Sequence, residues 1–179
     1  MHPREPFETG RQLFKSPFYE REVALGGYFM EAAGWERAHG YAANEPTLLA
    51  KYRDQIPQRM NEWDSRHFWE VSNAEQLAPS DDVGMVNLSH FAIYDIDGPS
   101  AEHLLEYLAV ARVGGATQVG KGVYTHFLDG KGGIRADLTI VRLSEDCFRV
   151  ICGGGTGHRD LVWIKQMAAV RNADIEIHN

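Results

Sequence analysis

Cysteine is scarce in this sequence: among 179 residues, only Cys147 and Cys152 occur. They lie five positions apart around a short apolar run, and on one strand this odd spacing points them to opposite faces. We therefore expect no disulfide between them. A protein without disulfides fits a reducing compartment, and we expect the cytoplasm.

Basic blocks and long apolar runs are missing as well. No run of five basic residues occurs, and the formal net charge is -7, from 18 Lys and Arg against 25 Asp and Glu. A dedicated nucleic-acid binder normally carries a basic face, so the composition argues against that class. No apolar run approaches the roughly 18 residues of a membrane span, and the start lacks the apolar core of a signal peptide. We expect a soluble, untargeted protein that binds neither nucleic acid nor membranes.

The composition is that of a globular protein, with 44% hydrophobic and 11% aromatic residues. A chain of this length can bury a real core and most simply forms one domain. Residues 1–17 are polar and interrupted by proline and glycine without any period, so they predict an N-terminal arm. The domain itself is expected over residues 18–179.

Signals for secondary structure are weaker in the first half of the chain. Residues 19–36 alternate apolar and polar side chains around the Gly26-Gly27 pair, which predicts a short hairpin with Trp35 just beyond a tight turn. Residues 44–71 mix charged and aromatic side chains, and Pro46 and Pro57 limit this stretch to short helices.

The second half shows a clear order of elements. We predict a strand over residues 90–98, a helix from Pro99 to about Val110, a loop over 111–122, and strands over 123–129, 133–145 and 147–152. Thr156 is expected to cap a helix with Leu161, Ile164 and Ala168 on one face, and residues 173–178 predict a final strand. This order indicates an α+β fold with an antiparallel sheet and packed helices.

A glycine-rich turn follows the strand at residues 147–152 and opens the last helix. Its sequence, Cys-Gly-Gly-Gly-Thr-Gly from Cys152 to Gly157, contains no lysine to meet a phosphate and lacks the spaced glycines of a dinucleotide site. Two interpretations remain: a tight connection between a strand and a packing helix, or a backbone that approaches a ligand closely.

Other catalytic patterns are hard to find. The eight histidines include no pair with the spacing of a zinc site, and we expect no metal. No Gly-x-Ser-x-Gly motif marks a serine nucleophile. Cys152 could be a nucleophile, but no neighbour in the sequence activates its thiol, so a buried small residue is the better interpretation.

One carboxylate stands out, because Asp137 interrupts an apolar alternation that includes Leu138 and Ile140. It could lie on the solvent face together with Arg135 and Thr139, which share its parity along the strand. Alternatively it could point into a pocket as a base or as a partner for a positively charged amine.

Three stretches resemble, in order, the N-terminal part of the glycine-cleavage T-protein (aminomethyltransferase) family. They are SPFYEREVALGGYFMEAAGWERAHGY at residues 16–41, VGMVNLSHFAIYDIDGPSAEHLLEYL at 83–108, and GKGVYTHFLDGKGGIRADLTIVRLSEDCFRVICGGGTGHRDLVWI at 120–164. Within the family, GWER and ADLTIVRL are nearest to the folate-binding domains of dimethylglycine and sarcosine dehydrogenases and related tetrahydrofolate-dependent demethylases. The resemblance implies one half of a T-protein-like folate-binding fold.

The resemblance also implies which residues would contact tetrahydrofolate. Tyr124 matches a tyrosine that lines the pterin channel, and the acidic pair of the T-protein motif matches Ala136-Asp137. Because Ala136 stands where T-proteins carry their catalytic acid, Asp137 is the candidate base, and glycine cleavage itself is in doubt. At the turn, Cys152, Gly153 and Gly154 would lie beside the pterin, with Gly153 where T-proteins have an asparagine.

Two functional hypotheses follow from the resemblance. The first is a subunit of a tetrahydrofolate-dependent methyl or aminomethyl transferase or demethylase that acts on a small methylated donor. The second is a non-catalytic folate-family binding or assembly subunit of a larger oxidoreductase or demethylase complex. Family enzymes build their channel from two repeated halves, so we expect a second subunit, or a second copy of this chain, to complete it.

Overall fold

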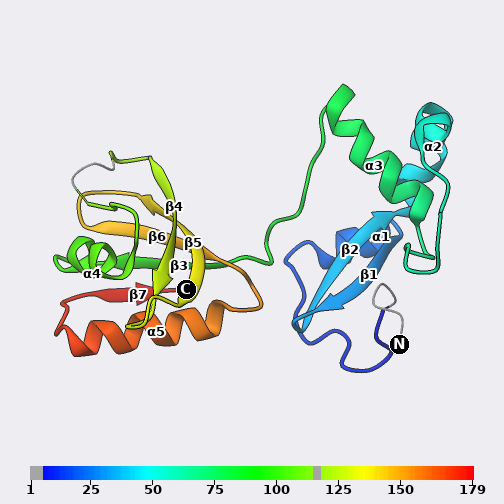
Figure 1. Ribbon diagram of the computed structural model, residues 1–179. Helices are drawn as coiled ribbons and strands as arrows, with labels where there is room; N and C mark the ends of the chain where they lie inside the picture. Colours follow the sequence, from blue (N-terminus) through cyan, green and yellow to red (C-terminus); the bar gives the residue numbers. More distant parts are fainter. Residues whose placement is uncertain (1–5, 115–117) are drawn as a thin grey trace. The chain divides into compact units, whose positions relative to one another are not determined.

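A computed structural model describes residues 6–114 and 118–179 of the chain (Figure 1). The chain forms two compact units, residues 1–89 and residues 90–179. Unit 1 contains α1 (Tyr19–Ala24), β1 (Gly27–Ala32), β2 (Trp35–Tyr41), η1 (Ala42–Asn44), α2 (Glu45–Tyr52), η2 (Arg53–Gln55) and α3 (Trp69–Asp81). Unit 2 contains β3 (Ala92–Asp97), α4 (Ala101–Leu108), β4 (Gly122–Leu128), β5 (Ile134–Arg142), β6 (Cys147–Cys152), α5 (Gly157–Val170) and β7 (Glu176–His178).

The hairpin of unit 1 is displaced from its predicted place. Its strands β1 and β2 pair antiparallel around a two-residue turn, Ala33-Gly34, in which both residues have positive φ, at 53° and 85°. Such a turn matches the twist of the strands it joins. The prediction of a hairpin around Gly26-Gly27 is wrong, because Gly26, at φ 71°, ends helix α1. Trp35 does follow a tight turn, as predicted.

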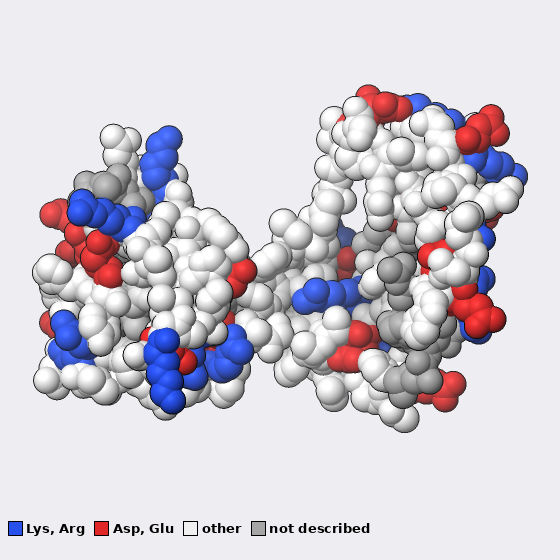
Figure 2. Space-filling model, viewed as in Figure 1, with Lys and Arg blue, Asp and Glu red and all other residues white. Residues whose placement is uncertain are grey.

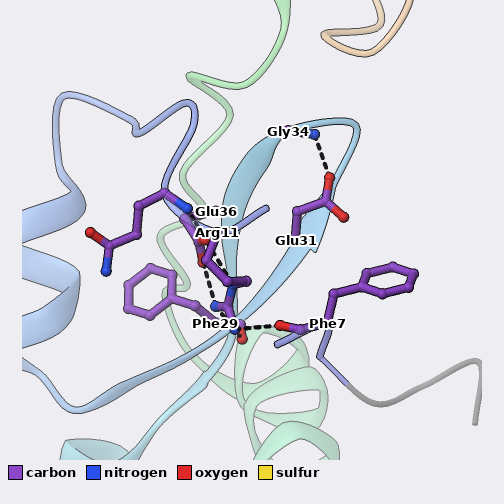
Figure 3. A network of polar contacts seen from close by, with 7 residues as sticks. Phe7, Arg11, Phe29, Glu31, Gly34 and Glu36 are labelled. Carbon is purple, nitrogen blue, oxygen red and sulfur yellow. Dashed lines mark hydrogen bonds and ion pairs between the residues drawn. The ribbon is translucent and has the colours of Figure 1, made fainter. Parts of the chain in front are cut away.

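Arg11 is one of the residues that hold the N-terminal segment on this hairpin (Figure 3). Arg11 Nε donates to Glu36 Oε1 at 2.8 Å, and its Nη1 and Nη2 donate to the carbonyls of Phe7 and Phe29, each at 3.2 Å. The amide of Gln12 donates to the same Glu36 oxygen at 2.6 Å. Glu36 is fully buried, and its hydrogen bonds with Arg11 hold the pKa of the carboxyl below its ordinary value. These contacts fasten residues 7–12 to β1 and β2.

Unit 2 is a two-layer arrangement of helices on an antiparallel sheet. The strand order is β4-β5-β6-β3-β7, and every pairing is antiparallel. Alternate side chains of the strands form one buried cluster with apolar residues of both helices, so α4 and α5 cover the same face of the sheet. The cluster consists of Tyr94, Ile96, Ala101, Leu104, Leu105, Leu108, Val113, Phe127, Ala136, Leu138, Ile140, Phe148, Val150, Cys152, Ile164 and Ala168.

The predicted α+β class and the antiparallel sheet are confirmed. In unit 2 each predicted strand and helix forms, and its observed ends differ from the predicted ones by a few residues. Parts of two predicted segments, residues 1–5 of the arm and 115–117 of the loop, lie outside the described residues. The boundary between an arm ending at residue 17 and a domain starting at 18 stays a prediction. Over the described ranges, no helix is both long and apolar enough to cross a membrane.

Candidate functional site

The face of the sheet opposite α4 and α5 carries the candidate base. In the β4-β5 register, Tyr124 faces Thr139 and His126 faces Asp137. The Tyr124 hydroxyl donates diagonally to Asp137 Oδ2 at 2.8 Å, and the His126 ring stands edge-on to the tyrosine ring, 5.4 Å between centroids. This hydrogen bond raises the pKa of Tyr124 above its ordinary value, because the carboxylate stabilises the protonated phenol.

Asp137 also lines an open hollow of about 430 Å³ at one end of the sheet. The hollow lies between the start of β5, the residue before β3, and the turn from β6 to α5. Its lining residues are Phe91, Ile134, Arg135, Ala136, Asp137, Gly153, Thr156 and Arg159. Two of the residues predicted for the site, Asp137 and Gly153, therefore line the same hollow. Tyr124 does not line it but donates a hydrogen bond to Asp137, which does.

A β-bulge sets the direction of the side chains beside Asp137. The register between β4 and β5 shifts by one residue, which leaves Arg135 as the extra residue of β5. The Arg135 guanidinium lies 4.4 Å from the ring centre of Trp163 in α5, so Arg135 does not share the solvent face with Asp137 as parity predicted. Ala136 is buried in the core, and Asp137 is exposed. The two interpretations of Asp137 are compatible, because its side chain is exposed and also lines the hollow.

The glycine-rich turn connects β6 to α5 and forms one wall of the hollow. Gly153 has open space around it, since the nearest atom that an added Cβ would meet is Thr156 Oγ1 at 3.5 Å. Cys152 is buried, and burial, followed by the nearby Asp160 carboxylate, raises the pKa of its thiol to about 12. Very little of this thiol is ionised at neutral pH, which argues against a role for Cys152 as a nucleophile. Gly154 follows in the same turn but does not line the hollow.

The sequence predictions missed a polar cluster behind this wall. Thr156 takes the predicted N-cap position of α5, yet its side chain makes no capping bond. Its hydroxyl instead lies 2.8 Å from Asp160 Oδ2 and 3.2 Å from the Gly153 carbonyl. Asp160 precedes Ile164 and Ala168 by four and eight residues, which places it on the core face of the helix. The sequence did contain a signal for this cluster, because an acid such as Asp160 is unusual on the core-facing side of a helix.

Charge in unit 2 is mixed. On the side shown in Figure 2, Lys and Arg are interspersed with Asp and Glu. Among the described residues, no group of three His, Cys, Asp or Glu side chains is arranged to hold a metal ion. The ionic residues that line the hollow are Asp137, Arg135 and Arg159, so its lining carries one carboxylate and two guanidinium groups.

A model of the GCVT N-terminal domain family matches residues 18–179. The chain belongs to this family. Among solved structures, it is similar to the glycine cleavage system aminomethyltransferase T from Bartonella henselae, with a TM-score of 0.66 and 20% sequence identity. The similarity covers 93% of this chain and 38% of that chain, so the GCVT-family chain described here spans well under half of its structural neighbour. At this identity the likeness establishes the fold, and the family match confirms the predicted T-protein resemblance, while the dehydrogenase and demethylase branch stays a prediction.

Proposed function

We propose that this chain provides one half of a tetrahydrofolate site in a one-carbon transferase or demethylase that moves a methyl or aminomethyl group. The observation that carries the proposal is the position of Asp137. Its carboxylate is exposed, accepts a hydrogen bond from Tyr124, and lines a hollow whose opposite wall is the glycine turn. Membership of the GCVT N-terminal domain family supports the same cofactor.

The residues around the hollow fit a flat, nitrogen-rich ring. Gly153 leaves room for close backbone approach, and the Tyr124 ring, 62% exposed, offers an apolar face. Tetrahydrofolate, when bound, supplies the nitrogen atoms that carry the one-carbon unit. Asp137 would hold or accept the proton at such a nitrogen, and Tyr124 would orient the carboxylate for that step.

Two other residues of the predicted site have smaller parts in this proposal. The buried Cys152 would contribute through its backbone alone, because its thiol faces the core. Gly154 would keep the turn small, so that the chain can pass beside the ring without a side chain in the way.

We further propose that a partner chain completes the site, either a different subunit or a second copy. The hollow is open, and apolar side chains beside it are exposed, with Phe91 at 46% and Ile134 at 67%. Covering these side chains would remove water from the reacting groups. A small methylated donor would bind mainly through the partner, and two cysteines that form no disulfide fit a cytoplasmic location.

Calorimetric titration with tetrahydrofolate tests the proposal, with the chain alone and with proteins that co-purify with it. We expect binding in at least one of these states. Asp137→Asn should then reduce one-carbon transfer far more than it reduces tetrahydrofolate affinity. The absence of binding in both states would contradict the proposal, and equal loss of transfer and affinity would make Asp137 a binding residue only.

A non-catalytic folate-binding or assembly subunit is the second candidate. The observation in its favour is Ala136, which is buried in the core at the position where the T-protein motif carries its acid. This candidate predicts tetrahydrofolate binding without transfer in the wild-type complex. It also predicts that Asp137→Asn leaves the activity of the complex unchanged, which separates the two functions in one assay.

A further inference from the structure

A buried carboxylate lies directly behind the hollow. Asp160, in the first turn of α5, is only 2% exposed, and a carboxylate so far from water needs strong compensating contacts. Thr156 Oγ1 donates to its Oδ2 at 2.8 Å, and Arg159 Nε donates to its Oδ1 at 3.1 Å. The Nη2 of the same arginine lies 3.0 Å from Oδ1. Thr156 and Arg159, two of the partners of this carboxylate, line the hollow.

Arg159 connects this carboxylate to the strand that bears Asp137. Its Nη2 also donates to the backbone carbonyl of Arg135 at 2.7 Å. Arg135 is the extra residue of the bulge in β5 and lies two residues before Asp137. The helix thus holds the bulge at two points, through this carbonyl and through the contact between the Arg135 guanidinium and the Trp163 ring.

We propose that Asp160 is a positioning residue for Asp137. It fixes the Arg159 guanidinium, the guanidinium fixes the bulge at Arg135, and the bulge sets the direction in which the Asp137 side chain leaves β5. A bulge beside a functional residue commonly serves to aim that residue's side chain. The positioning role rests on the proposed function of Asp137 as the base, but its structural part can be measured without any ligand.

Amide hydrogen exchange, followed by NMR on the full chain, tests the structural part. We expect Asp160→Asn and Arg159→Met to increase exchange at residues 134–137 on the order of 10-fold, with residues 138–142 of the same strand unchanged. Because Arg159 is exposed, the second variant is expected to fold even if the first does not. Unchanged exchange at residues 134–137 in Arg159→Met, or equal acceleration along all of β5, overturns the proposal.

Asp95→Asn is the matched control, since it also removes one carboxylate from an Asp-Arg pair of unit 2. Asp95 Oδ1 and Oδ2 accept from Arg149 Nε and Nη2, each at 2.8 Å, on strands β3 and β6. The bulge lies between β4 and β5, away from this pair, so the variant should leave exchange at residues 134–137 as in the wild type. Acceleration there equal to that of Asp160→Asn overturns the proposal, because the effect would then reflect general destabilisation.

A kinetic measurement on the complete enzyme tests the functional part. We expect Asp160→Asn to lower kcat for one-carbon transfer on the order of 10-fold, with KM for tetrahydrofolate within about 2-fold of the wild type. A rise in KM without loss of kcat overturns the positioning role. If tetrahydrofolate does not bind at all, the proposed function fails, and the exchange experiment still decides whether Asp160 fixes the bulge.

Discussion

At the scale of single residues, the site depends on which face of β5 each side chain takes. Ala136 enters the core, and Asp137 leaves on the opposite face, where Tyr124 donates to it from the neighbouring strand. The extra residue Arg135 lies just before this pair and turns its own side chain to Trp163. A carboxylate at position 136 would be buried in the core with the helices, whereas the Asp137 carboxylate is exposed.

The bond between Tyr124 and Asp137 predicts a measurable titration. Asp137→Asn should lower the pKa of Tyr124 toward that of an ordinary tyrosine, because the neutral amide no longer stabilises the protonated phenol by charge. Carbon-13 NMR of the tyrosine rings measures this, with Tyr124→Phe to assign the signal. An unchanged Tyr124 titration in Asp137→Asn would show that the bond is absent in solution.

The two cysteines should differ in reactivity with alkylating reagents. Cys152 is buried and its pKa is raised to about 12, mainly by burial, so almost none of its thiol is ionised at pH 8. Cys147 is partly exposed. Brief treatment of the native protein with iodoacetamide, followed by peptide mass spectrometry, should find the modification at Cys147 first. Faster modification of Cys152 would contradict its burial under the turn.

At the scale of elements, Arg11 links the N-terminal segment to the hairpin, in addition to the backbone hydrogen bonds that Phe14 makes with Gly34 and Glu36. Arg11 contacts Glu36 on β2 and the Phe29 carbonyl on β1, while the Glu36 carboxylate is buried between the segment and the hairpin. Contacts of this kind stabilise most when the carboxyl is ionised, because the arginine charge then has an opposite charge beside it.

Acid should weaken this attachment. The folded pKa of Glu36 lies below its unfolded value, so its contribution is fully present above the unfolded pKa of about 4.3 and is lost as pH falls through the folded pKa. At pH 7, Arg11→Met should lower the free energy of unfolding by about 2 kcal/mol. The difference in the free energy of unfolding between Arg11→Met and the wild type should shrink below about pH 4. Urea unfolding of both proteins from pH 3 to 7 measures it, and a pH-independent difference would contradict the role of the charge.

Sequence reasoning succeeded where local patterns decide the structure. In unit 2, apolar residues alternate along the strands and recur at helical spacing along α4. These residues form the core. It failed at residues 19–26, where Gly26 ends a helix instead of making a hairpin turn. A glycine with positive φ serves both purposes, so its presence alone does not distinguish them.

The candidate site was predictable in part. Asp137 and the glycine turn could be identified from the residues themselves, because an acid in an apolar alternation and a run of glycines are unusual. The resemblance added Tyr124 and the expected place of the turn beside the pterin. The contacts of Arg159 with Asp160 and with the Arg135 carbonyl could not be predicted, because they depend on a bulge and on the packing of α5 against β5. Neither feature leaves a periodic signal in the sequence.

At the scale of the whole molecule, each unit has its own core. The cluster of unit 2 contains only residues between 94 and 168, and the second cluster, Leu49, Tyr52 and Ala74, belongs to unit 1. The hollow and Asp137 are entirely within unit 2. A chain of which each part has its own buried residues can fold part by part.

We therefore expect residues 90–179 to fold without unit 1. Expressed alone, this fragment should keep the circular dichroism of a mixed helix and sheet protein and unfold cooperatively, because its core cluster is complete. Residues 1–89, with their small cluster, are the matched comparison and should be the less stable fragment. A fragment 90–179 that lacks a cooperative transition would contradict the independence of its core.

The central claim is that the hollow beside Asp137 is half of a tetrahydrofolate site. The most direct test is a calorimetric titration with tetrahydrofolate, with and without the co-purifying partner, of the wild type and Asp137→Asn. The account predicts binding in the wild type, and an Asp137→Asn protein that retains most of this affinity but loses one-carbon transfer on the order of 100-fold. A wild-type protein that binds no tetrahydrofolate in either state would contradict the account.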